Sequence, residues 1–408
     1  MHDAPASARF PETLDAATLR AWLIEYVCPY WADRVVDPKG GFFESLDAQG
    51  VAVKSSRRTV MVLGRLTYVF SHATVLDPTG LMKTVAAHGF EELSRWEHEC
   101  GTVGGWARAR LVGGGIEDAT RDTYDQAFVI LACAWYHAAT GSSAAVAMAQ
   151  RAYGFFEAHV RDAVHGGFFE EFPDTRKLPR RQNPHMHLLE ACLAMYRATC
   201  DATWLSRCDG LLSLFRSCLF DPASGTIAEF YAGDWTLVAG PQGQIREPGH
   251  QFEWVWLLAE YRRLGGTQET ADLQEKLFAF GRRYGIDGAE PRMVFDAIDP
   301  AGAVIANTKL FWPQTEYIKA CVVRAESGDN FAASEIDLHL RKLKQHFFRA
   351  DGANWCNHIS RSGTFMVNET PARVLYHLFL AVAEMVRYKD LLAARPELAQ
   401  AARTGDAA

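Results

Sequence analysis

The sequence predicts an all-α fold, an (α/α)6 barrel of six helix pairs with short β-hairpins in the loops at one end. A glycine-containing phrase recurs six times, with glycines near positions 40, 104, 166, 225, 288 and 352 of the 408 residues. A repeat that continues along the whole chain indicates one supersecondary unit used six times. Between the phrases, apolar residues recur with the period of a helix, two helices per repeat. Six helix pairs in a ring would bury their apolar faces against one another.

The recurring phrase has the composition of a tight turn and is often followed by a second turn. The clearest copies are Gly40–Glu44 and Gly166–Glu170, both Gly-Gly-Phe-Phe-Glu, and second turns follow at 46–50 and 298–302. Such segments are typical of hairpins. The six copies occupy residues 37–45, 104–108, 165–171, 221–229, 287–295 and 351–357.

Twelve helices are expected, at residues 14–27, 59–76, 80–97, 124–139, 144–160, 184–199, 202–218, 250–264, 269–284, 312–327, 330–347 and 370–389. An open solenoid of helix pairs would also repeat, but its units are usually about 34 to 47 residues long and carry no hairpin. We therefore expect one barrel domain over residues 1–408, with residues 1–11 and 395–408 flexible.

Composition restricts the partners of the chain. Its 49% hydrophobic residues can bury a large core, and 42 basic against 49 acidic residues, without a basic run, argue against nucleic acid or an anionic membrane. Nine cysteines form no Cys-x-x-Cys pair, and several lie in apolar helical patterns, which predicts reduced core thiols and no disulfides. No signal core and no stretch of about 18 apolar residues is present. We expect a cytoplasmic monomer or homodimer.

In a ring of helix pairs, polar groups at the starts of the inner helices converge on a central cavity. His250 follows Pro248-Gly249 at such a start, with Glu253 on the same helix face. Backbone N–H groups there disfavour a protonated imidazole, so we expect His250 to be neutral at pH 7, with Glu253 holding its tautomer. The alternative is a partly buried structural histidine.

Other polar residues stand out in the expected inner helices. Arg65 lies in an apolar run, where it must be paired, face a wet cavity or reach the surface. Asn183 and His187 share a helix face, whereas His185 points elsewhere and forms no metal motif with His187. His377 lies in an apolar helix. Each histidine could instead be a hydrogen-bonded core residue.

A further group lies at or beside hairpins and helix starts. Tyr124 and Asp125 precede an apolar helix, where Asp125 could serve only as a favourable first-turn acid. Flat aromatic rings at a cavity suit the apolar C–H face of a sugar, although each ring alone could be core. The aromatic candidates are Trp312, Trp355, Trp106 and Phe42.

These motifs, in this order, resemble the N-acylglucosamine 2-epimerase superfamily over nearly the whole chain, and within it the bacterial mannose isomerases. The motifs are Leu63-Gly-Arg65-Leu, Asn183-x-x-x-His187, Gly249-His250-x-x-Glu253, Trp312-Pro-Gln-x-Glu316 and Tyr376-His377. The resemblance implies an (α/α)6 barrel, a monosaccharide substrate and two catalytic histidines, His250 and His377, that work without a metal or cofactor. It also implies substrate-binding or supporting roles for Arg65, Tyr124, Asn183, His187, Glu253 and Trp312.

The implied reaction is an aldose–ketose isomerisation between D-mannose and D-fructose, or D-lyxose and D-xylulose, through a cis-enediol. His377 is expected to move the proton at C2, with Arg65 and His187 stabilising the enediolate. A sugar 2-epimerase remains an alternative because it shares the first step. An inverting glycoside hydrolase, with Glu253 and Asp125 as acid and base, and a non-catalytic sugar-binding scaffold are more distant alternatives.

Overall fold

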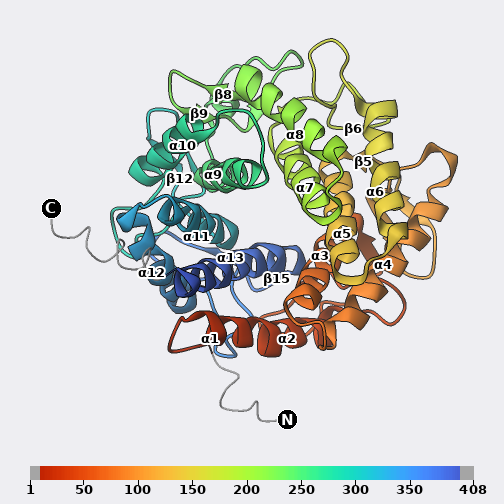
Figure 1. Ribbon diagram of the computed structural model, residues 1–408, viewed down its shortest axis with the longest axis horizontal. Coiled ribbons are helices and arrows are strands. Elements are labelled where there is room, and N and C mark those ends of the chain that lie inside the picture. Colours follow the sequence, from red (N-terminus) through yellow and green to blue (C-terminus); the bar gives the residue numbers. More distant parts are fainter. Residues whose placement is uncertain (1–9, 396–408) are drawn as a thin grey trace.

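The computed structural model describes residues 10–395, which form a closed double ring of helices around a central axis (Figure 1). Each inner helix contacts the next, and the last contacts the first, which closes the ring. The predicted (α/α)6 barrel is confirmed. The inner helices are α3 (Val60–Leu76), α5 (Thr123–Thr140), α7 (Asn183–Thr199), α9 (Pro248–Arg263), α11 (Phe311–Glu326) and α13 (Leu375–Ala394).

The outer helices pack on the inner ring and face solvent on their other side. Because the inner helices are covered on nearly all sides, they are apolar around most of their circumference, whereas the outer helices are amphipathic. Three outer helices contain π-helical turns. The outer segments are α1 (Ala16–Ala21), η2 (Trp22–Val27), α2 (Cys28–Val35), α4 (Met82–Glu99), α6 (Ser143–Phe155), η4 (Phe156–Val160), α8 (Ala202–Leu214), η5 (Phe215–Leu219), α10 (Ala271–Tyr284) and α12 (Asn330–His346).

Short antiparallel strands lie in the loops that lead into the inner helices. Some form hairpins within one repeat: β3 (Ala109–Leu111) with β4 (Ile116–Asp118), β8 (Phe220–Asp221) with β9 (Thr226–Ile227), and β11 (Ala297–Ile298) with β12 (Val304–Ala306). The others join separate loops: β1 (Ser45–Leu46) with β15 (Thr370–Pro371), β2 (Arg57–Thr59) with β3, β5 (Arg121–Asp122) with β6 (Glu171–Phe172), β7 (Arg180–Arg181) with β10 (Phe230–Tyr231), and β13 (Lys309–Leu310) with β14 (His358–Ile359). Some strand pairs therefore form a hairpin within one loop, and others connect two neighbouring loops.

The last predicted helix begins later than expected. Residues 370–374 form β15 and a 3-10 turn, η7 (Ala372–Val374), and α13 starts only at Leu375. Pro371 has extended backbone and lies opposite Ser45 in the β1–β15 pair, so it ends a strand instead of starting a helix. Two further 3-10 turns are η3 (Gly101–Val103) and η6 (Pro241–Gln244).

A recurring set of side-chain hydrogen bonds joins the start of an inner helix to the backbone of the loop before it. Gln126, Gln251 and Gln314, each in the first turn of an inner helix, bond both backbone groups of one residue in the preceding phrase. In α7 the place is taken by His185, whose Nε2 accepts from the backbone N–H of Phe168 at 2.9 Å. The starts of α5, α7, α9 and α11 are therefore each fixed to the loop that precedes them.

Other sequence expectations concern the cysteines and the chain ends. All nine cysteines are free, and most are buried. Among residues 10–395, no helix is long and apolar enough to cross a membrane. The flexible ends expected at 1–11 and 395–408 lie almost entirely outside the described residues.

Candidate active site

A cavity of about 240 Å³ lies at the N-terminal ends of the inner helices, and we call it the N-terminal cavity. The structure brings all eight candidate site residues to its walls. Arg181, Glu229, Phe230, Glu247, Leu310, Asn357, Arg373 and Val374 complete the lining. The eight candidates are Arg65, Tyr124, Asn183, His187, His250, Glu253, Trp312 and His377.

Asp125 does not line this cavity, although it follows Tyr124 directly in the first turn of α5. Its carboxylate is buried 3.9 Å from Arg108 Nε, and burial together with the neighbouring Asp122 charge raises the pKa of Asp125 to about 8. The acid–base pair expected for a hydrolase, Glu253 with Asp125, is therefore not assembled in the cavity. Trp106, Trp355 and Phe42 are buried in the core and do not line it either.

His250 lies in the first turn of α9 between two carboxylates. Its Nδ1 is 2.7 Å from Glu229 Oε2 and 3.4 Å from Glu247 Oε2. Burial lowers the pKa of His250, but the Glu229 and Glu247 charges outweigh it and raise the pKa to about 10. The expectation of a neutral His250 was wrong, because the Glu229 carboxylate at 2.7 Å, assisted by Glu247, outweighs the partial charge of a helix start. With Nδ1 bound to Glu229, the Nε2–H is the group left to donate into the cavity.

Glu229, not Glu253, orients His250. Glu229 ends the fourth repeated phrase, at the position that Glu44 and Glu170 hold in the first and third. Those two acids accept from the backbone N–H groups of Thr59 and Arg181, in the strands that lead to α3 and α7. Glu229 keeps a similar bond from Glu247 N at 3.2 Å and binds the histidine with its other oxygen. Aligning the phrases with one another could have identified it.

His377, in the first turn of α13, is in the opposite charge state. Its Nδ1 is 2.7 Å from Glu316 Oε1, and Glu316 Oε2 is 2.6 Å from Lys319 Nζ. Burial, assisted by the charges of Arg65 and Lys319, holds the pKa of His377 well below its ordinary value. Burial and the Glu253 charge raise the pKa of Glu316 well above its ordinary value, but the Lys319 ammonium 2.6 Å from its oxygen opposes that shift. With Glu316 held as a carboxylate by this contact, Nδ1 donates to it and Nε2 keeps a free lone pair. His377 is therefore a neutral imidazole that can accept a proton.

Trp312 lies between the two histidines. Its ring centroid is 4.8 Å from that of His250 and 5.6 Å from that of His377. Gly249 permits this arrangement, because a Cβ at Gly249 would lie 2.6 Å from the indole. The acid and the base thus border the same aromatic surface.

Arg65 supplies a fixed positive charge in the cavity wall. One Nη donates to the Tyr124 hydroxyl, and the other is 3.2 Å from the backbone oxygen of Arg373. The guanidinium carbon is 4.2 Å from the centre of the Phe128 ring, and Arg65 forms no ion pair with any described carboxylate. Its charge is therefore available to an anionic oxygen of a ligand.

His187 and Glu253 lie deeper in the barrel. His187 Nδ1 is 3.1 Å from Glu190 Oε2 and 3.9 Å from Glu253 Oε1, and the Tyr376 hydroxyl donates to Glu190 at 2.5 Å. Neither oxygen of Glu253 accepts a hydrogen bond from a described residue. Glu253 therefore adds negative charge near His187 and does not hold the tautomer of His250.

Two asparagines offer unused acceptors. The side-chain oxygens of Asn183 and Asn357 are shielded from solvent and have no hydrogen-bond partner among residues 10–395. Buried acceptors without a partner are costly in a folded protein, so their place in the wall indicates bonds to ligand hydroxyls. Asn357, like Arg373 and Glu247, was missed in the sequence because nothing local separates it from an ordinary loop residue.

Comparison with known proteins identifies the family of the chain. Residues 41–381 match the model of a family described as N-acylglucosamine 2-epimerase. A protein of Rhizobium meliloti named mannose-6-phosphate isomerase is 30% identical over 385 residues, which are 91% of this chain and 97% of that protein. A D-mannose isomerase of Marinomonas mediterranea is 27% identical over 75% of this chain and 80% of its own. A crystal structure of a D-mannose isomerase superposes with a TM-score of 0.82 at 22% identity, covering 93% of this chain and 99% of that one.

Proposed function

We propose that this chain, which belongs to the N-acylglucosamine 2-epimerase family, is an aldose–ketose isomerase that interconverts D-mannose and D-fructose, with D-lyxose and D-xylulose as a second pair. Family membership makes it a sugar isomerase or epimerase. The observation that carries the finer proposal is the opposite protonation of two histidines beside one aromatic surface. An acid and a base ready at the same pH are what ring opening and enolisation require.

In the proposed mechanism, His250 acts first. Its Nε2–H protonates the ring oxygen of the pyranose while the proton of the C1 hydroxyl is released, and the ring opens to the aldehyde. The carboxylates of Glu229 and Glu247 keep the imidazolium charged up to about pH 10, so the acid is present throughout the neutral range. Trp312 holds the apolar face of the sugar close to the imidazole.

His377 then moves the proton that defines the reaction. Its neutral Nε2 takes the proton from C2, and the C2 electrons form the carbon–carbon bond of a cis-enediolate. Arg65 donates to the enediolate oxygens, where negative charge develops, and His187, whose Nδ1–H is held by Glu190, lies in the same wall. His377 returns the proton to C1 while the proton of the O2 hydroxyl passes to O1, so that O2 becomes the ketone oxygen and O1 a hydroxyl.

A 2-epimerase would share the first half of this path and return a proton to the opposite face of C2. The family description favours this second candidate, whereas the names of the two relatives above favour isomerisation. The name of the Rhizobium protein also makes phosphorylated sugars candidate substrates. Arg373 lies in the cavity wall and forms no ion pair with a described carboxylate, so its charge could bind a phosphate group.

The deciding experiment is product analysis. The full chain is incubated with D-mannose in heavy water, and the products are resolved by NMR spectroscopy, with and without a chelator. We expect D-fructose, with deuterium entering at C1, at a rate unaffected by the chelator. D-glucose as the sole product would assign the epimerase instead. Mannose 6-phosphate, N-acetylmannosamine and cellobiose, tested in the same way, define the substrate class.

A further inference from the structure

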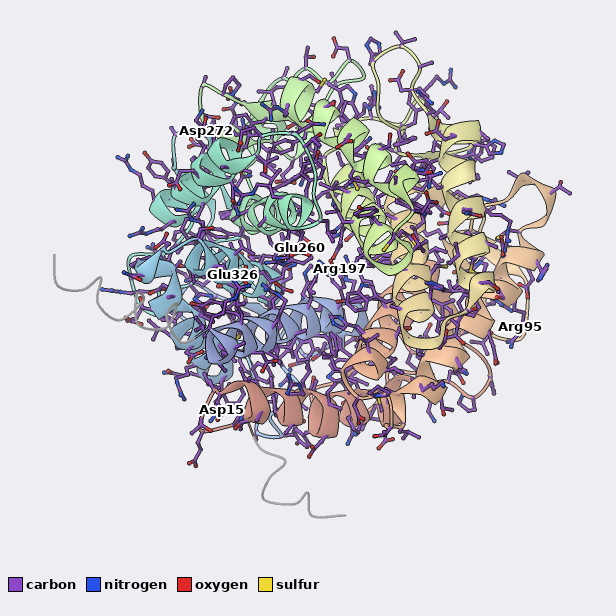
Figure 2. All side chains as sticks on the ribbon, viewed as in Figure 1. Asp15, Arg95, Arg197, Glu260, Asp272 and Glu326 are labelled. Atoms are coloured by element: carbon purple, nitrogen blue, oxygen red, sulfur yellow. The ribbon has the colours of Figure 1, made fainter. Side chains whose placement is uncertain are left out.

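A second cavity, of about 260 Å³, lies at the opposite end of the barrel. The C-terminal halves of the inner helices form most of it, so we call it the C-terminal cavity. Figure 2 shows two of its residues, Arg197 of α7 and Glu260 of α9, near the middle of the ring. The wall also includes Tyr68, His72, Trp135, Glu190, Trp256, Glu384 and Arg387.

Two indoles give this cavity flat apolar surfaces. Trp135 stacks on the His72 ring with centroids 3.6 Å apart, and Trp256 has the Lys319 ammonium 4.4 Å from its centre. Burial lowers the pKa of His72 to about 3, so this ring is neutral at pH 7. Trp135 is only partly buried, which leaves part of its surface open.

Each arginine of the wall is paired with a carboxylate, and the fourth acid, Glu190, is bound by His187 and Tyr376. Arg197 pairs with Glu260, Arg387 binds Glu384 at 2.8 Å, and Arg20 binds Asp390 at 2.6 Å at the mouth. Although Arg197 lies near the ring axis, 40% of its side chain is exposed, so the cavity is open to solvent down to that level. A site with balanced charges favours a neutral ligand over an anion or a cation, and its carboxylates and guanidinium groups can bond hydroxyls.

We propose that the C-terminal cavity is a second binding site, which takes a neutral polyhydroxyl molecule of monosaccharide size. The flat indoles suit the C–H face of such a molecule, and the neutralised Arg and Glu groups suit its hydroxyls. Its volume, about 260 Å³ against about 240 Å³ for the N-terminal cavity, holds a ligand of similar size. This site lies apart from the proposed isomerase residues and does not depend on that function.

One residue connects the two cavities. Glu190 lines the C-terminal cavity, while its carboxylate accepts from His187 Nδ1 of the N-terminal cavity and from the Tyr376 hydroxyl. A hydroxyl that bonds Glu190 from the C-terminal side competes for the same oxygens. The two sites are therefore coupled, and each ligand changes the affinity for the other by the same factor.

D-Sorbitol, a neutral hexitol with no carbonyl group to isomerise, is the probe. Crystals of the full chain are soaked in it, and binding is measured by calorimetry on wild type, Trp135→Leu and Trp312→Leu. The two variants are matched, since each replaces one partly buried indole in one cavity. We expect sorbitol in both cavities, the C-terminal site weakened about tenfold by Trp135→Leu only, and the N-terminal site weakened by Trp312→Leu only.

Three results would overturn the proposal. The first is sorbitol in the N-terminal cavity alone at concentrations that saturate that cavity. The second is a C-terminal site unaffected by Trp135→Leu, and the third is a cavity that excludes sorbitol but binds inorganic sulfate or benzene, which would assign an anion or an apolar ligand. If Trp135→Leu does not fold, the wild-type soak and a two-site fit still decide between these outcomes.

Discussion

The two ends of the barrel are built from the same six inner helices but differ in how their polar groups are paired. In the N-terminal cavity, Arg65 has no carboxylate partner within residues 10–395, and the acceptors of Asn183 and Asn357 have no donor there. In the C-terminal cavity, Arg197 and Arg387 are neutralised by Glu260 and Glu384. The unpaired groups mark the end where a ligand must complete the structure.

The helix dipoles reinforce this difference. All six inner helices direct their N-terminal N–H groups toward the N-terminal cavity, where the proposed enediolate would develop negative charge. Arginines lie at the opposite ends, as Arg197, Arg263 and Arg324 are in the last turns of α7, α9 and α11. The same backbone thus stabilises an anionic intermediate at one end and cationic side chains at the other.

The largest expected effect is a loss of kcat on replacing His377, in contrast to replacing His185, which has a structural role. His377→Gln removes the proposed base, and kcat should fall by about 10² to 10⁴-fold, measured as fructose formed from mannose. The control is His185→Gln, because Gln126, Gln251 and Gln314 already occupy the equivalent place in other repeats. Its activity should stay within a few-fold of wild type. Equal losses in both variants would contradict the assignment.

The next prediction concerns the buried ion pair of Lys319 and Glu316. Lys319 and Glu316 are fully buried, with Nζ 2.6 Å from Oε2. Lys319→Met leaves the Glu316 carboxylate buried near Glu253 without its counter-ion, so the free energy of unfolding should fall by about 3 to 5 kcal/mol. Denaturant titration measures it at pH 7. A change below about 1 kcal/mol would show that Glu316 is neutral in the native protein.

A smaller effect concerns the pH range of the proposed acid. The folded-state pKa of His250, about 10, lies above its ordinary value of 6.5, so its contribution to stability is complete below pH 6.5 and is lost as pH rises through 10. Glu229→Gln removes the nearer negative charge, so the alkaline limb of the pH–rate profile should move to lower pH. Glu44→Gln, the matching acid of the first repeat, should leave this limb in place. An unmoved limb in Glu229→Gln would exclude His250 as the acid.

Sequence patterns predicted the ring of helices and the residues of the candidate site better than they predicted which side chains bind one another in that site. The repeat gave the inner helices α3 to α11 to within a few residues, because burial imposes their apolar composition, but the first outer helix continues past its predicted end at Val27 to Val35. The eight candidate residues converge because the first two turns of the inner helices surround one cavity. The partners Glu229 and Glu316 were not assigned, since they lie 21 and 61 residues from their histidines. The charge of His250 depends on those partners and could not be predicted from its helix position alone.

The smallest expected effect is at the C-terminal end, in the pair formed by Arg197 and Glu260. The Arg197 side chain is 40% exposed, and Glu260 also binds Arg263, so its charge keeps a counter-ion when Arg197 is replaced. Arg197→Met should therefore lower the free energy of unfolding by less than about 1 kcal/mol, in contrast to Lys319→Met. The same denaturant titration compares the two variants directly. A loss as large as that of Lys319→Met would show that Arg197 is a buried structural cation and that the C-terminal cavity is closed to solvent.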